Sequence, residues 1–181
     1  MIIDGKEEFV MTVIMAAGKG TRMKSNKSKL VQKIFEKELV KRVAELAVNI
    51  GSDEVVTVVG YLREQIEAVL KDTVKYAYQE ELLGTGHAVM QATKYLEGKK
   101  GKVIILYGDV PIIREKTLKN LVEKSIRNKE TILLFITKKN CSRCIEIKNE
   151  LEKNNTLYAE LNIDMRGYPV EVAMLSVKQL S

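Results

Sequence analysis

The chain has 181 residues, of which 45% are apolar and 30% are charged, which is ordinary for a soluble globular protein. No apolar run approaches the ~20 residues that span a bilayer, and the N-terminus lacks a basic region followed by an apolar core, so we expect a cytoplasmic protein without a signal peptide. The net charge of +6 arises within residues 1–129, where the cations gather on a glycine loop without interleaved aromatics, which favours a small anionic ligand over nucleic acid.

Strand-like and helix-like segments then alternate along the chain. Short Val- and Ile-rich runs predict buried strands at residues 10–15, 54–60, 74–78, 102–107 and 131–136. Amphipathic stretches predict helices at residues 38–49, 62–70, 87–96 and 115–127. This order is typical of an α/β fold in which helices cover both faces of a parallel sheet. Ligands of such sheets bind beyond the carboxyl ends of the strands.

The segment after the first strand predicts a phosphate-binding loop. Gly18 and Gly20 allow a tight turn and a close approach of backbone N–H groups to a ligand. Six cations and no acid lie between residues 19 and 33, and backbone donors combined with positive charges are how proteins hold phosphates. Met23 stands where a P-loop needs its second glycine and a dinucleotide fingerprint its third small residue, which excludes both motifs.

Two later segments are expected at the same end of the sheet. Gln79 and the turn Gly84-Thr85-Gly86 follow the third strand, where the Gln79 amide would read a nucleobase through its donor and acceptor atoms. Gly108 and Asp109 follow the fourth strand, where a carboxylate is well placed to hold Mg²⁺ that bridges phosphates. Each segment alone also fits a plain turn, but the three in this order indicate a nucleotide site.

These motifs resemble those of one enzyme family. The uridylyltransferase domain of bacterial UDP-N-acetylglucosamine pyrophosphorylases, bifunctional enzymes of peptidoglycan precursor synthesis, is similar at residues 16–23 (Ala-Ala-Gly-Lys-Gly-Thr-Arg-Met), Lys29, Gln79, 83–88 and 107–111. The resemblance covers about residues 9–128. It implies a Rossmann-like nucleotidyltransferase sheet of the MobA-like NTP transferase type, UTP and N-acetylglucosamine 1-phosphate as substrates, and Mg²⁺ as cofactor.

The resemblance also implies a role for each matching residue. Arg22 and Lys29 would be the catalytic cations that hold the triphosphate and stabilise the leaving pyrophosphate, and Asp109 would be the metal ligand. The substrate-binding residues would be Met15, Ala16, Ala17 and Gly18 along the nucleotide, Lys29 at the phosphates, Gln79, Gly84 and Thr85 at uracil, and Tyr107, Gly108 and Asp109 toward the ribose and sugar. In-line attack of the sugar phosphate on the α-phosphorus needs positioning and charge neutralisation rather than a nucleophilic side chain.

Two residues within the matching region need separate comment. His87, the only histidine, follows a glycine at a helix start, and we expect it to fix this turn rather than to act as a base. Ser28 stands where the family usually carries the proline of a Leu-Pro-Lys sequence. Loss of that stiffening residue could raise the entropy cost of ordering the loop before Lys29.

After about residue 129 the family's sugar-binding residues cannot be placed, so we expect residues 1–129 to form a truncated nucleotidyltransferase domain. Residues 130–181 instead resemble part of a glutaredoxin- or thioredoxin-like βαβα segment, with a second strand at 156–163 and a second helix at 170–180. Cys141 would be the redox nucleophile at a helix start beside Arg143, and Cys144 would resolve the disulfide.

Three functions therefore stay open. The chain is a sugar-phosphate nucleotidyltransferase, a thiol–disulfide redox protein that uses Cys141 and Cys144, or an inactive fusion product that binds a nucleotide. Its expected partners are nucleotide and sugar-phosphate substrates, with no nucleic acid and no membrane. An oligomer, or a partner that completes the sugar-binding half, is kept as an alternative.

Overall fold

A computed structural model describes residues 2–3, 6–20, 26–127, 133–138, 149, 158–163 and 169–173. The chain divides into two compact units, Met1–Asn120 and Leu121–Ser181. Within the described part of the chain, no helix has the length and apolarity that crossing a bilayer requires.

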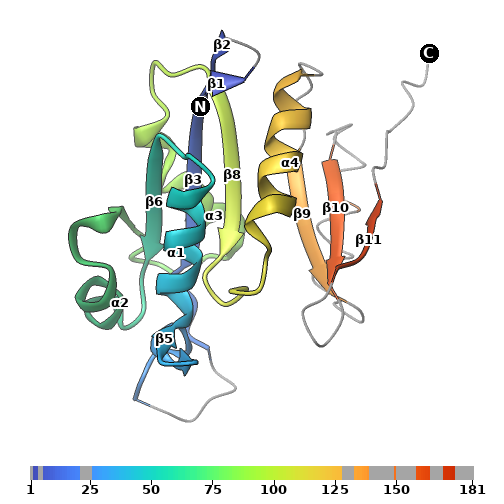
Figure 1. The fold of residues 1–181 in the computed structure, drawn as a ribbon. Coiled ribbons are helices and arrows are strands. Elements are labelled where there is room, and N and C mark those ends of the chain that lie inside the picture. Colours follow the sequence, from blue (N-terminus) through green and yellow to red (C-terminus); the bar gives the residue numbers. More distant parts are fainter. Residues whose placement is uncertain are drawn as a thin grey trace. The chain divides into compact units, whose positions relative to one another are not determined.

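The first unit is built on a four-stranded parallel sheet with the strand order β7-β6-β3-β8 (Figure 1). Its strands are β3 (Phe9–Ala16), β6 (Glu54–Val59), β7 (Lys75–Tyr78) and β8 (Gly101–Tyr107). The chain runs from β3 outward to β7 and then returns to place β8 on the other side of β3. The strand order therefore reverses between β3 and β8, and open α/β sheets bind ligands beyond the carboxyl ends of the strands at such a point.

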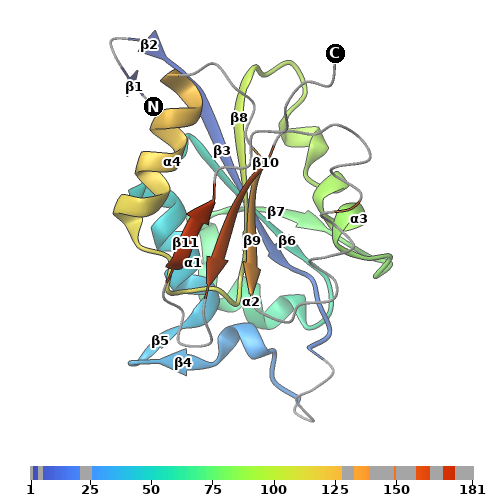
Figure 2. The same cartoon turned by 90° about the vertical axis from the view of Figure 1, so that its right-hand side faces the viewer.

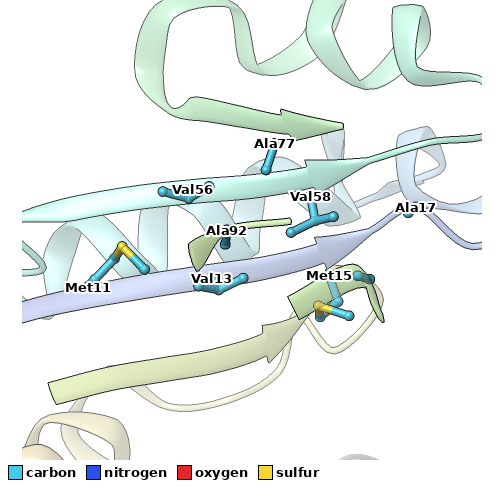
Figure 3. Packing of buried hydrophobic residues seen from close by; sticks show 9 residues of the cluster. Met11, Val13, Met15, Ala17, Val56, Val58, Ala77 and Ala92 are labelled. Atoms are coloured by element: carbon cyan, nitrogen blue, oxygen red, sulfur yellow. The ribbon is translucent and has the colours of Figure 1, made fainter. Parts of the chain in front are cut away.

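Helices cover both faces of this sheet, as predicted. On one face Met11, Val13 and Met15 of β3 pack with Ala88 and Ala92, in and just after α3 (Thr85–Met90) (Figure 3). Side chains alternate across a strand, so Val10 and Ile14 lie on the opposite face, beneath α1 (Leu39–Asn49), and both are fully buried. Figure 2 shows α1 and α3 on opposite sides of the sheet.

The remaining elements of the first unit are short or terminal. Helix α2 (Arg63–Leu70) buries Ile66 and Leu70. Helix α4 (Glu115–Arg127) has the predicted bounds and contains the boundary between the two units. Two small antiparallel hairpins and three 3₁₀ turns complete the described elements of this unit: β1 (Ile2–Ile3) with β2 (Lys6–Glu7), β4 (Lys33–Ile34) with β5 (Lys37–Glu38), η1 (Lys29–Val31), η2 (Lys71–Thr73) and η3 (Thr93–Tyr95).

The helix predicted at residues 87–96 is wrong in its bounds. It begins two residues earlier, at Thr85 after the positive-φ Gly84 (φ 104°), and the α-helix ends at Met90. The chain then tightens, because the N–H of Ala92 bonds to the carbonyl of Val89 at 2.9 Å, one residue short of the α-helical spacing. The Thr93 hydroxyl bonds back to the Met90 carbonyl at 2.7 Å, a competition that often ends or bends helices.

The second unit contains a three-stranded mixed sheet with the order β11-β10-β9. The predicted strands at 131–136 and 156–163 are found as β9 (Leu133–Lys138) and β10 (Tyr158–Ile163), which are parallel. The helix predicted at 170–180 is wrong over its first residues, since β11 (Pro169–Ala173) pairs antiparallel with β10. Alternating β-branched residues favour a strand there once a partner strand is available. The rest of that helix lies outside the described residues.

Candidate active site

Lys29 and Asp109 meet at the carboxyl end of the first unit's sheet, although 80 residues separate them in the sequence. Lys29 opens η1 after the glycine loop, and Asp109 follows β8. The Lys29 Nζ donates to Asp109 Oδ2 at 2.8 Å, and the two side chains are 47% and 38% exposed. So exposed an ion pair contributes only about 0–1 kcal/mol to stability. The pair therefore adds little stability, but both charges are accessible from solvent at the point where the strand order reverses.

Gly108 holds the end of β8 against the end of β3. Its N–H donates to the Met15 carbonyl at 3.0 Å. A Cβ at this position would lie 3.2 Å from that carbonyl oxygen and 3.4 Å from the Leu30 side chain, which is tighter than side chains normally pack. A glycine therefore lets Asp109 emerge directly beside the loop that follows β3.

The second predicted segment is held together by the Gln79 side chain, which is only 4% exposed. Its Nε2 donates to the Gly84 carbonyl at 3.0 Å and lies 3.1 Å from His87 Nδ1. The other ring nitrogen of His87 lies 3.0 Å from the Gln91 amide. His87 thus connects the turn to α3, in agreement with the prediction that it fixes this turn.

A hollow of about 410 Å³ opens beside this segment, lined by Lys19, residues 60–64 and Gln79, Glu80 and Leu82. Across it the Arg63 guanidinium donates to the Glu80 carboxylate at 2.9 Å, a bond that raises the pKa of Arg63. Gly60 forms the wall between the strand ends, since a Cβ there would lie 2.9 Å from the Gln79 carbonyl oxygen. The same Cβ would lie 3.1 Å from the Ala17 side chain, so the chain segments that follow β3, β6 and β7 lie close together at Gly60.

The sequence profile of the MobA-like NTP transferase domain matches residues 12–168. The chain belongs to this family. The match continues past residue 128, where the motifs of the sequence analysis end, and it includes the segment with Cys141 and Cys144. The predicted domain boundary at residue 129 and the thioredoxin-like resemblance stay predictions.

The curated relatives of this chain include two proteins that are named bifunctional protein GlmU. The protein from Caldanaerobacter subterraneus subsp. tengcongensis is 52% identical over 131 residues, which are 71% of this chain and 28% of the relative. The protein from Thermoanaerobacter pseudethanolicus is 40% identical over 183 residues, which cover 93% of this chain and 39% of the relative. The chain thus spans only about a quarter to two fifths of the length of these relatives.

Among solved structures, Rv0371c from Mycobacterium tuberculosis H37Rv is similar with a TM-score of 0.69 and 14% identity, over 88% of this chain and 90% of that one. A second structure of Rv0371c, a complex with manganese, has a TM-score of 0.65 over 86% of this chain and 89% of that one. At this level of identity the likeness supports the shared fold alone.

Most of the predicted site residues of this MobA-like domain lie at the carboxyl end of the sheet. Met15 and Ala16 end β3, followed by Ala17 and Gly18, and Met15 pairs in register with Tyr107 at the end of β8. Gly84 and Thr85 begin α3, and Gly108 and Asp109 follow β8. The predicted catalytic Arg22 lies outside the described residues, as do Cys141 and Cys144.

Sequence reasoning missed three residues that shape the site: Gly60, Arg63 and Gln65. Gly60 carried a signal, because a glycine directly after a buried strand often marks a close approach of backbone. Gln65 carried none, because its carboxamide bonds only to backbone atoms of the glycine-loop segment, at Asn26 and Ser28. Such contacts depend on the fold and leave no pattern along the chain.

A metal ion at this site would have few protein ligands. No group of three or more His, Cys, Asp and Glu side chains with metal-binding geometry occurs among the described residues. Asp109 offers one exposed carboxylate. This donor set suits a hard cation that takes its other ligands from phosphates and water, as Mg²⁺ does in nucleotide-binding proteins, and it does not suit a cation that needs a full cage of protein ligands.

Proposed function

We propose that this chain is a sugar-phosphate nucleotidyltransferase that forms UDP-N-acetylglucosamine and pyrophosphate from UTP and N-acetylglucosamine 1-phosphate. The observation that carries the proposal is the exposed Lys29–Asp109 pair beyond β3 and β8. Membership of the NTP transferase family and the identity of 40–52% to GlmU proteins support it. Because the chain spans only 28–39% of the length of those relatives, the activity of the whole relative is a proposal for this chain.

Lys29 and Asp109 are suited to exchange their mutual ion pair for contacts with a nucleotide and its metal ion. The two charges neutralise each other at 2.8 Å. A nucleotide that arrives with its metal ion supplies an anion for the ammonium and a cation for the carboxylate. Since the exposed pair is worth about 1 kcal/mol at most, little stabilisation is lost when each partner turns to the ligand. Arg22 would add a second cation from the same loop.

The cation proposed at Asp109 is Mg²⁺. When bound between the carboxylate and the phosphates, it would neutralise charge on the triphosphate. The carboxylate of Asp109 follows a β-strand and is directed toward the loop of Lys29, so it would orient the nucleotide rather than take part in covalent chemistry. The manganese complex of the similarly folded Rv0371c is consistent with a divalent cation.

The Gln79 amide supports uracil as the base. Its Nε2 donates to the Gly84 carbonyl and lies 3.1 Å from His87 Nδ1, so we expect the other amide atom, Oε1, to meet the base. An oxygen can accept a hydrogen bond from the N3–H of uracil, whereas N3 of cytosine is itself an acceptor and would be repelled. The arrangement therefore favours UTP over CTP, and UTP as substrate implies a cytoplasmic enzyme.

The test is release of pyrophosphate from UTP and N-acetylglucosamine 1-phosphate in the presence of Mg²⁺. We expect turnover that requires both substrates and falls at least 100-fold in Lys29→Ala, the loss typical when a charge-stabilising donor is removed. Turnover by the Lys29→Ala variant equal to that of the unaltered chain would contradict the proposal. Binding of UTP without any turnover would instead support the nucleotide-binding alternative.

A further inference from the structure

The segment that leads to Lys29 is fastened to helix α2 by the side chain of Gln65. The Gln65 Oε1 accepts a hydrogen bond from the Ser28 N–H at 2.8 Å, and its Nε2 donates to the Asn26 carbonyl at 2.9 Å. One carboxamide therefore satisfies two backbone groups on either side of Lys27. The helix that carries it is anchored in the core, because its Ile66 and Leu70 are 0% and 1% exposed.

Ser28 connects the Gln65 contact to Lys29, the next residue in the chain. Its side chain is buried, and its hydroxyl accepts a bond from the Leu30 N–H at 3.3 Å, which caps the 3₁₀ turn that Lys29 opens. The backbone of Lys29 is thus fixed from both sides, by the held Ser28 before it and by the packed Leu30 after it. The ammonium can then reach Asp109 at 2.8 Å across the end of the sheet.

We propose that Gln65 is a positioning residue that holds Lys29 at the phosphates of the nucleotide. The proposal rests on the proposed function, because it assumes that Lys29 meets a triphosphate. Without Gln65, residues 26–29 would have to be ordered by the nucleotide itself, and the lost chain entropy would weaken binding. Gln65 lies 36 residues from Lys29 in the sequence and would not touch the substrate.

The backbone at Ser28 allows a specific rescue. Its φ of −58° and ψ of 137° lie in the region that proline adopts. A proline at this position would restrain the same backbone angle covalently, while it would remove the N–H that Gln65 binds and the hydroxyl that caps the turn at Leu30. Ser28→Pro should therefore compensate for loss of Gln65, whereas a residue that only stabilises α2 could not be replaced by a change in the loop.

The experiment compares the affinity of the full chain for UTP–Mg²⁺ by calorimetry across three variants. Gln65→Met keeps the length of the side chain and removes both hydrogen bonds, and it should bind about 5- to 30-fold more weakly. The double variant Ser28→Pro/Gln65→Met should recover part of this loss, since the proline restrains the backbone but lacks the hydroxyl cap. Ala68→Met, which puts the same residue on the exposed side of α2, is the matched control and should bind like the unaltered chain.

Hydrogen exchange at the Ser28 amide separates this inference from the proposed function. The amide should exchange slowly in the unaltered chain and in Ala68→Met, and much faster in Gln65→Met. If the unaltered chain binds no UTP, the proposed function fails, and the exchange rates alone decide whether Gln65 holds the loop. Equal UTP affinity, or equal Ser28 exchange, in Gln65→Met and the unaltered chain would overturn the inference.

Discussion

The two ends of the first unit's sheet use charged residues in opposite ways. At the amino end, Glu54 opens β6 and accepts hydrogen bonds from Lys75 at 2.6 Å and Lys99 at 2.8 Å, with its side chain only 15% exposed. At the carboxyl end, Lys29 and Asp109 form a single ion pair with 47% and 38% of their side chains exposed. The lysines at the amino end are themselves 54% and 35% exposed, so the difference lies in the carboxylate: the shielded Glu54 can hold strands together, whereas the exposed Asp109 can exchange its partner for a ligand.

Other contacts at the two ends of the sheet differ in the same way. At the amino end the Asp53 carboxylate accepts from the Val10 N–H at 2.8 Å, and the Asp53 N–H donates to the Val10 carbonyl at 2.8 Å. The Thr12 and Ser52 hydroxyls lie 2.7 Å apart. These groups bond to one another within the protein, although the second carboxylate oxygen of Glu54, Oε2, is buried without a hydrogen-bond partner. At the carboxyl end, two glycines, Gly60 and Gly108, instead bring backbone close together and leave an open surface.

The largest expected effect is that of Lys29→Ala, which removes the exposed cation proposed to bind the nucleotide at the carboxyl end of the sheet. A hydrogen bond to a charged group is worth about 1.5–3 kcal/mol, so affinity for UTP–Mg²⁺ should fall roughly 10- to 100-fold. The free energy of unfolding should change by less than about 1 kcal/mol, because the ion pair is exposed. Calorimetry and urea unfolding of the same samples measure both quantities. A loss of stability without a loss of affinity would show that Lys29 stabilises the fold and does not bind the nucleotide.

The second effect concerns Gly60→Ala. Its Cβ would lie 2.9 Å from a backbone oxygen of Gln79, so the ends of β6 and β7 must separate, at about 1–3 kcal/mol of stability. The hollow lined by Gln79 should widen and UTP affinity should fall as well. Gly86→Ala is the matched control, because a Cβ there meets nothing within 4 Å; thermal unfolding should place it within a few degrees of the unaltered chain.

The smallest effect is expected at the amino end, from Glu54→Gln. Hydrogen bonds from Lys75 and Lys99 lower the pKa of Glu54 below its usual value of 4.5, against the opposing effect of burial. The folded chain therefore binds this proton less readily than the unfolded chain, so Glu54 stabilises the fold above about pH 4.5 and loses this effect as pH falls through the lowered pKa.

Glu54→Gln should accordingly lower the free energy of unfolding by about 1 kcal/mol at pH 7 and by progressively less in acid, as measured by urea unfolding across pH. Its affinity for UTP–Mg²⁺ should not change. A variant as weak in binding as Lys29→Ala would show that the two ends of the sheet are not independent.

The sequence predicted those features that depend on local pattern. The apolar run of β3 and the amphipathic period of α4 were sufficient to place both elements. Residues 170–173 were wrongly assigned to a helix because their conformation is decided by pairing with β10. Individual site residues followed from motifs, but the meeting of Lys29 with Asp109 follows from the strand order. The Gln65 contact could not be predicted, since its partners are backbone atoms 37 and 39 residues away.

The most direct test of a uridine nucleotide site at the carboxyl end is parallel calorimetric titration of the full chain with UTP–Mg²⁺ and CTP–Mg²⁺. We expect saturable binding of UTP at one site per chain and at least tenfold weaker binding of CTP, because a Gln79 oxygen opposite ring position 3 accepts from the N3–H of uracil but faces an acceptor in cytosine. Absence of saturable UTP binding, or equal affinity for the two nucleotides, would contradict it.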